Sequence, residues 1–239
     1  MQEIVFQVFT DGDIEASEKT PLYLRYSFLE MKLEEKSELD KALEKPSPRL
    51  LKTHLQPKFF EKTLKNKKPK VIVVFRNPKD MLVSYFNFHR SAPFDFPTDG
   101  TWEELFDRFK NDKLVHGNYF DMQLAWWEYK DDPRFFFTTY EDMTKDPVKT
   151  ICDVAKFLEK AISDELVMKI VERTSFSSMK NNPMLNYSTL DRIDQNISAF
   201  MRKGKIGDWK NVFSKEQQEY VDKISKEKFE PAGIFLEDE

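Results

Sequence analysis

The chain has 239 residues, with 38 lysines and arginines against 42 aspartates and glutamates, so its formal net charge is −4. Hydrophobic residues make up 40% of the chain, which is enough for a sizeable core and excludes a disordered protein. The 6 glycines and 12 prolines exclude a collagen-like or low-complexity chain. A net charge so close to zero argues against general nucleic-acid binding, and the longest apolar run, 71–75, is too short to span a membrane.

Cys152 is the only cysteine, which excludes an intramolecular disulfide and a cysteine-based zinc site. A chain without disulfides is typical of a reducing compartment. The first residues have no basic segment, no long apolar segment and no small-residue cleavage site, so they do not resemble a secretory signal. We therefore expect a cytoplasmic location.

The first nine residues, MQEIVFQVF, predict an amphipathic helix, because their apolar residues recur at i, i+3, i+4, i+7 and i+8. No Ser, Thr, Asp or Asn precedes this helix to cap its free N–H groups. Two interpretations stay open at this point: an uncapped helix at a chain end, or a helix whose upstream sequence is missing.

Strand patterns alternate with helix patterns along the rest of the chain. Residues 48–55 predict a short strand with a polar tip, and the lysine-rich residues 57–70 predict a solvated helix and turn without a ligand role. Residues 71–75, VIVVF, have the pattern of a strand buried on both faces of a parallel sheet, and a helix follows them. Residues 134–139 predict a further strand.

Helix-start signals mark several of the remaining helices. Capping boxes are predicted at Thr101 with Glu104 and at Ser214 with Gln217, and Ser163 is a candidate N-cap. Other helices are predicted over 119–129, 148–159 and 164–173, whereas 175–200 reads as mostly irregular. This alternation, with no internal repeat and no Gly/Ser linker, predicts one α/β domain around a parallel sheet over residues 1–239.

Common catalytic and nucleotide-binding motifs are absent from the sequence. It contains no GxxxxGK[ST], no GxGxxG and no GxSxG, and its three histidines lack the spacing of a metal site. One remaining feature is Lys52-Thr53-His54, because alternation along a strand places Lys52 and His54 on one face at a strand end. The pair could join a general base to an anion stabiliser, or it could be two unrelated polar residues at a surface strand end.

Three further features could bind an anion or a base. Arg76 with Ser84 on the following helix suits a phosphate, or Arg76 pairs with Asp80 at the helix start. Residues 200–210, with two glycines and four cations, can surround an anion or form a basic surface loop. Residues 173–179 offer hydroxyls, Phe and Met to a purine, or they are a helix end with Phe176 in the core.

Taken together, five segments resemble the cytosolic sulfotransferases, in the same order along the chain. They are PRLLKTHL, VIVVFRNPKDMLVSYFNF, YEDM, TSFSSMKNNPMLNYS and FMRKGKIGDWKNVFS. The resemblance covers essentially the whole chain, and RKGxxGDWKN is highly specific. It implies transfer of a sulfuryl group from 3′-phosphoadenylyl sulfate (PAPS) to a hydroxyl or amine, without a metal. The implied fold is a three-layer α/β sandwich with a central parallel sheet, related to the P-loop nucleotide kinases.

The resemblance also implies roles for individual residues. His54 matches the family's catalytic base, and Lys52 matches the lysine that stabilises charge at the transferring group. Phe28 and Phe88 match acceptor-pocket residues. The residues that match cofactor-binding positions, around the 3′-phosphate or the adenine, are Arg76, Ser84, Tyr140, Thr174, Phe176, Phe200, Met201, Arg202, Lys203 and Gly204.

The sequence departs from the family in two places. It lacks the phosphosulfate-binding loop, TYPKSGTTW or similar, so the first strand and this loop are expected to be missing and the helix at Met1 to follow directly. Ser214-Lys215 stands where the family's dimer segment has Thr-Val, which weakens the expectation of a homodimer. The expected function is a sulfotransferase for a small aromatic or otherwise apolar acceptor. The alternative is a non-catalytic relative that binds PAPS or its product 3′-phosphoadenosine 5′-phosphate (PAP), or an inactive truncated isoform.

Overall fold

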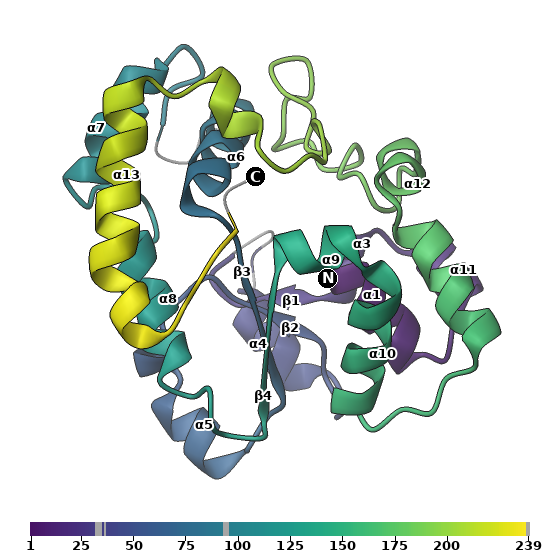
Figure 1. Cartoon of the computed structure of the whole chain (residues 1–239). Coiled ribbons are helices and arrows are strands. Elements are labelled where there is room, and N and C mark those ends of the chain that lie inside the picture. The colour runs from purple at the N-terminus through teal and green to yellow at the C-terminus, as the bar shows by residue number, and fades with distance from the viewer. Residues whose placement is uncertain (32–34, 36, 93–95, 238–239) are drawn as a thin grey trace. The chain divides into compact units, whose positions relative to one another are not determined.

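The chain folds into two compact units, each built from segments that lie far apart in the sequence (Figure 1). The computed structural model describes residues 1–31, 35, 37–92 and 96–237. The first unit comprises Met1–Leu55 and Val148–Asp191, and the second comprises Gln56–Pro147 and Arg192–Glu239. Each unit holds one pair of parallel strands.

The first unit surrounds a short parallel pair of strands with helices. Strand β1 (Ser27–Phe28) pairs with β2 (Leu51–Lys52), and Phe28 lies opposite Lys52 in the register. The helices of this unit are α1 (Gln2–Phe9), α2 (Ile14–Lys19), α3 (Leu22–Arg25), α4 (Glu38–Glu44), α10 (Pro147–Phe157), α11 (Asp164–Thr174) and α12 (Phe176–Asn181).

Helix α1 confirms the helix predicted for the first residues, and its N-cap, Met1, makes no side-chain capping hydrogen bond. The predicted apolar face accounts for only part of its burial, because Glu3 and Gln7 are each 1% exposed. The Glu3 carboxylate accepts from Arg25 Nη1 at 2.7 Å and from Arg173 Nε at 2.6 Å. Gln7 Nε2 donates to the same carboxylate at 2.8 Å. A buried ion-pair cluster therefore joins α1, α3 and α11.

Removing the negative charge of this cluster is expected to destabilise the first unit strongly. In Glu3→Gln, the Arg25 guanidinium stays buried without its carboxylate and Arg173 keeps only Glu18, and breaking such a buried pair costs about 3 kcal/mol or more. Urea unfolding followed by far-ultraviolet circular dichroism measures the loss. Glu15→Gln is the matched control, because its ion pair with Lys19 is exposed and a change there should stay within about 0.5 kcal/mol. Equal free energies of unfolding for the two variants would contradict a stabilising role of the buried ion-pair cluster.

The second unit contains the longer strand pair and the main hydrophobic core. Strand β3 (Val71–Phe75) pairs in parallel with β4 (Phe135–Thr139) along its whole length. The helices of this unit are α5 (Glu61–Asn66), α6 (Pro78–Ser91), α7 (Trp102–Lys110), α8 (Tyr119–Trp127), α9 (Tyr140–Lys145) and α13 (Lys215–Lys228). Figure 1 shows α6, α7, α8 and α13 gathered on one side of this strand pair.

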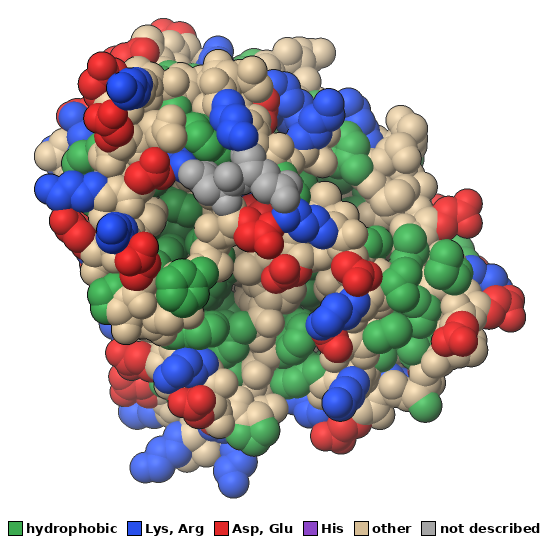
Figure 2. Space-filling model, in the orientation of Figure 1, with side chains coloured by type: hydrophobic (Ala, Val, Ile, Leu, Met, Phe, Trp, Pro, Cys, Tyr) green, Lys and Arg blue, Asp and Glu red, His purple; other side chains and the backbone are tan. Residues whose placement is uncertain are grey.

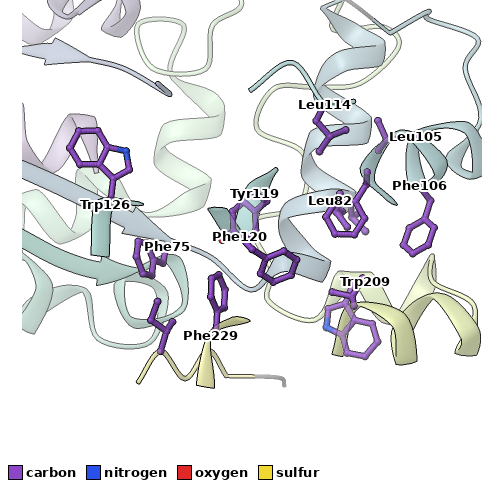
Figure 3. Packing of buried hydrophobic residues seen from close by; sticks show 14 of the residues in the cluster. Phe75, Leu82, Leu105, Phe106, Leu114, Tyr119, Phe120, Trp126, Trp209 and Phe229 are labelled. Atoms are coloured by element: carbon purple, nitrogen blue, oxygen red, sulfur yellow. The ribbon is translucent and has the colours of Figure 1, made fainter. Parts of the chain in front are cut away.

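Aromatic side chains dominate this core (Figure 3). Phe120 of α8 packs on Phe229 with ring centroids 4.9 Å apart, and Phe106 of α7 lies 5.9 Å from Tyr220 of α13. Leu82 of α6 is fully buried within the same cluster. Burial of many large rings gives the second unit a rigid base for the residues that follow β3 and β4.

Predictions that depend on residues close together in the sequence are confirmed in both units. The two capping boxes open α7 and α13, and Ser163 caps α11. The lysine-rich segment 57–70 forms α5, with exposed lysines, and positively charged side chains gather over α5 at the lower end of the view in Figure 2. Among the described residues, no helix combines the length and the apolar character needed to cross a bilayer.

Other expectations need correction. The described residues form two separate two-stranded sheets where one parallel sheet was expected. The strand predicted over 48–55 is reduced to β2, because only its two residues pair with β1. Strand β3 is only partly buried, since Val73 and Phe75 are buried and its other residues are half-buried. The segment 175–200 is mostly irregular, as expected, but it contains one short helix, α12, that Ser175 caps.

Candidate functional site

The candidate residues are divided between the two units. The first unit holds Phe28, Lys52, His54, Thr174 and Phe176. The second unit holds Arg76, Ser84, Phe88, Tyr140, Phe200, Met201, Arg202, Lys203 and Gly204.

Lys52, His54 and Phe28 lie together at the end of the β1–β2 pair. The Lys52 ammonium lies 4.6 Å from the centre of the Phe28 ring, and the His54 ring meets the same phenyl ring edge-on at 5.0 Å. His54 is exposed and Lys52 is half-buried. The Phe28 ring therefore contacts both the ammonium of Lys52 and the imidazole of His54 at this strand end.

Burial lowers the pKa of Lys52 to about 8, although the nearby Glu30 carboxylate opposes this shift. The phenyl ring of Phe28 replaces part of the water around the ammonium, which disfavours its charged form. Below pH 8 Lys52 carries the positive charge that an anion-stabilising role requires, and above that pH it loses this charge.

Glu30 is a residue of this site that the sequence reasoning missed. Its Oε1 accepts hydrogen bonds from the Thr53 hydroxyl, at 2.7 Å, and from the backbone N–H of His54. The Thr53 hydroxyl in turn accepts from the Leu55 N–H. Glu30 therefore fixes the turn that presents His54. The signal was the register, because Glu30 and His54 each follow the paired residues Phe28 and Lys52 by two positions.

Thr174 and Phe176 lie where α11 ends and α12 begins. Thr174 is the last residue of α11, and its hydroxyl donates to the Ile170 carbonyl at 2.7 Å. Phe176 is half-buried at the start of α12, so it is not the core residue of the alternative interpretation. Arg173 anchors this helix end through Glu3 and Glu18.

Arg76 and Tyr140 lie together after the two paired strands of the second unit. The Arg76 guanidinium stacks 4.3 Å from the centre of the Tyr140 ring, and its buried Nε has no hydrogen-bond partner among the described residues. Arg76 is not paired with Asp80, the alternative considered above, since Asp80 accepts from backbone groups of another segment. Ser84 follows in α6 and is half-buried.

The start of α6 is held by two side chains. Asn77 is the N-cap and accepts from the Lys79 N–H at 2.9 Å. The buried Glu141 accepts from the Asn77 N–H at 3.1 Å, and burial raises the pKa of this glutamate above its usual range. A fixed helix N-terminus next to Arg76 offers the positive end of the helix dipole to an anion.

The segment 200–209 forms a turn held by α6. The Asp80 carboxylate accepts from the backbone N–H groups of Gly207, at 2.6 Å, and Trp209, at 3.0 Å. Gly204 and Gly207 have φ of +63° and +80°, a region that disfavours side chains, which explains the glycine pair of the motif. At the start of the segment, Phe200 packs edge-on against Phe88 of α6 at 6.0 Å.

Arg202 and Lys203 both contact Asp208, which the sequence reasoning also missed. Arg202 Nη2 lies 2.5 Å from Oδ2 of this carboxylate and Lys203 Nζ lies 2.6 Å from Oδ1. Burial would raise the pKa of Asp208, but the hydrogen bonds from Lys203 and Arg202 outweigh this effect and lower it to about 2. Two cations of the basic loop are thus gathered around one carboxylate.

The two groups offer complementary chemistry. The first unit presents an imidazole and an ammonium beside an aromatic side chain, which suits proton transfer and anion stabilisation. The second unit presents an unpartnered guanidinium N–H, a helix N-terminus and two further cations, which suits a phosphate group. These residues fit a phosphorylated nucleotide on the second unit.

Comparisons with known proteins agree with this chemistry. The family model described as "Sulfotransferase domain" matches residues 1–233. The chain is 41% identical to sulfotransferase 1C2 from Homo sapiens over 237 residues, covering 98% of this chain and 80% of that protein. It is 38% identical to sulfotransferase 1A1 from Canis lupus familiaris, with the same coverage of both chains.

Solved structures with similar folds carry PAP. A mouse sulfotransferase complexed with PAP matches with a TM-score of 0.72 and 32% identity, covering 87% of this chain and 73% of that chain. Retinol dehydratase in complex with androsterone and PAP matches with a TM-score of 0.88 over 100% of this chain and 79% of that chain, and its 23% identity supports the fold alone. The family match over nearly the whole chain and the identities near 40% show that the chain belongs to the sulfotransferase family.

Proposed function

We propose that the chain transfers the sulfuryl group of PAPS to a hydroxyl or amine of a small, aromatic or otherwise apolar acceptor. The observation that carries this proposal is the placement of His54 and Lys52 at one strand end beside Phe28. These are the residue types that in-line group transfer needs, namely a base for the acceptor proton and a cation for the moving charge.

In the proposed step, the acceptor oxygen or nitrogen attacks the sulfur of PAPS. A new bond forms from the acceptor to sulfur, and the bond between sulfur and the bridging phosphate oxygen breaks. His54 removes the acceptor proton, and PAP leaves with the bridging oxygen. Lys52 stabilises the charge on the transferring group, a role that electrostatic preorganisation makes effective.

The proposed nucleotide contacts form two groups, one at the 3′-phosphate and one around the rest of the nucleotide. The 3′-phosphate is held by Arg76, Ser84, Arg202, Lys203 and Gly204. The positive charges of the second unit and the dipole of its helix N-terminus favour a phosphate there. The residues proposed around the rest of the nucleotide, chiefly the adenine, are Tyr140, Thr174, Phe176, Phe200 and Met201.

The acceptor is proposed to lie against aromatic side chains. Phe28 contacts both Lys52 and His54, and Phe88 packs on Phe200, so each candidate pocket residue lies next to a candidate catalytic or nucleotide residue. An apolar small molecule would bury these rings on binding. Androsterone and retinol, found with the structural relatives, are apolar molecules with a hydroxyl group.

We propose that the whole chain has the domain organisation of the family. The two units are proposed to act as one sulfotransferase domain, 1–239, with parallel strands in a three-layer arrangement related to that of the P-loop nucleotide kinases. Parallel pairing of both strand pairs supports this. We also propose a cytosolic location, and a homodimer is less expected because Ser214-Lys215 departs from the family's dimer segment.

A radiolabel assay tests the proposal. The purified chain is incubated with PAPS carrying labelled sulfate and a panel of phenols, steroids and arylamines, and transfer of label to at least one acceptor is expected. Absence of transfer across the panel, in a chain that binds PAP by calorimetry, would overturn the catalytic proposal.

A second candidate function is nucleotide binding without transfer. The observation that favours it is the buried Arg76 Nε, which has no hydrogen-bond partner among the described residues and lies next to the start of α6, because this arrangement suits a phosphate whether or not transfer follows. The radiolabel assay and the PAP titration together separate the two functions.

Removal of the Arg202 guanidinium is expected to weaken PAP binding. Arg202→Ala deletes one charge-assisted contact with the proposed 3′-phosphate, so the Kd for PAP should rise about 10- to 100-fold while that for AMP stays unchanged. Isothermal titration calorimetry measures both. Lys205→Ala is the matched control, because Lys205 is an exposed cation of the same loop. An equal loss of AMP and PAP affinity in Arg202→Ala would count against a 3′-phosphate contact.

A further inference from the structure

Asp208 occupies the two cations that the proposed function assigns to the 3′-phosphate. Its carboxylate lies 2.5 Å from Arg202 Nη2 and 2.6 Å from Lys203 Nζ, and Asn211 Nδ2 donates to Oδ1 at 3.2 Å. A phosphate that binds these cations therefore meets charges that a carboxylate already partly neutralises.

The loop is held to α6 by backbone hydrogen bonds that do not involve the Asp208 carboxylate. The residues on both sides of Asp208, Gly207 and Trp209, donate their N–H groups to Asp80 of α6. Lys79 adds a contact 3.9 Å from the centre of the Trp209 ring, and its ammonium donates to Asp222 of α13 at 2.6 Å. Asp80 and Lys79 thus hold the turn, while the carboxylate of Asp208 contacts the cationic side chains.

The Asp208 carboxylate is more deeply buried than the two cations that it contacts. Asp208 is 7% exposed, whereas the side chains of Arg202 and Lys203 are 27% and 47% exposed. The cations therefore face solvent on one side and the carboxylate on the other.

We propose that Asp208 is an internal anion that occupies Arg202 and Lys203 in the absence of nucleotide, and that it weakens and sets the affinity of the site for 3′-phosphorylated nucleotides. This rests on the proposed function, because the ligand is a nucleotide with a 3′-phosphate. Whether the phosphate displaces the carboxylate or binds beside it, the negative charge of Asp208 opposes a second anion on the same two cations.

Calorimetric titration of Asp208→Asn with PAP and with AMP tests the proposal. The substitution removes the charge and keeps the side-chain size, so PAP should bind about fivefold more tightly, while AMP affinity should stay unchanged. Asp107→Asn is the matched control, because it removes the same charge from an exposed pair with Lys110 and should change neither affinity. Asp208→Glu keeps the charge, so its affinity for PAP should remain close to that of the wild type.

The outcomes separate this proposal from the proposed function. Unchanged or weaker PAP binding by a folded Asp208→Asn, with Arg202→Ala still impaired for PAP, would overturn the role of Asp208 alone. No PAP binding by the wild-type chain would overturn both. If Asp208→Asn does not unfold cooperatively, Asp208→Ser replaces it in the titration, and failure of both variants to fold would show that the carboxylate is structural and would overturn the proposal.

Discussion

Replacing His54 by alanine is expected to lower kcat for sulfuryl transfer by about 10²–10⁴-fold, the usual contribution of a general base. The backbone of the turn should survive this change, because Glu30 holds His54 through the main-chain N–H and not through the imidazole. His54 is exposed, so its removal leaves no buried cavity. The loss should therefore fall on the chemical step.

The readouts are turnover with labelled PAPS and PAP affinity by calorimetry. PAP affinity should stay within about twofold of the wild type, since the imidazole is assigned to the acceptor and not to the nucleotide. His116→Ala, a histidine of the loop that precedes α8 in the second unit, is the matched control and should keep full turnover. Retained turnover in His54→Ala would remove the base from the proposed mechanism.

Short-range signals explain which elements could be predicted from the sequence. The capping boxes at Thr101 and Ser214 satisfy helix N–H groups with residues three positions away, so the pattern contains both partners. Strand β3 is recognisable because five consecutive apolar residues leave few alternatives. Helix α12 was missed because it spans only six residues and its cap, Ser175, lies in a run of hydroxyl residues typical of loops.

Site residues that could not be predicted depend on partners far away in the sequence. Glu30 contacts Thr53 and His54, more than 20 positions further along, and Asp80 binds the backbone of a turn more than 100 positions away. No periodicity or spacing encodes such pairs. Asp208 is different, since its partners are only five and six positions away. The sequence could not predict its role, because the loop's letters do not show whether the Asp208 side chain is buried against the cations or faces solvent.

Lys52 is expected to produce the second large effect. Lys52→Met removes the cation next to the transferring group, and the loss of one preorganised electrostatic contact typically lowers kcat about 10²–10³-fold. Lys52→Arg keeps a positive charge and should retain more activity than Lys52→Met. Lys62→Met is the matched control, because Lys62 is an exposed lysine of α5 in the second unit and its loss should leave turnover unchanged.

The pH dependence of Lys52 distinguishes a cationic role from a structural one. With a pKa of about 8, the free chain loses the Lys52 charge as the pH rises, so kcat/KM should fall above pH 8. The bound phosphosulfate favours the charged ammonium, so the corresponding fall in kcat should move to higher pH. Arginine stays charged over this range, so the alkaline fall should be absent from the kcat/KM profile of Lys52→Arg. A fall near pH 8 that persists in Lys52→Arg would show that another group titrates, and the charge of Lys52 would then not limit transfer.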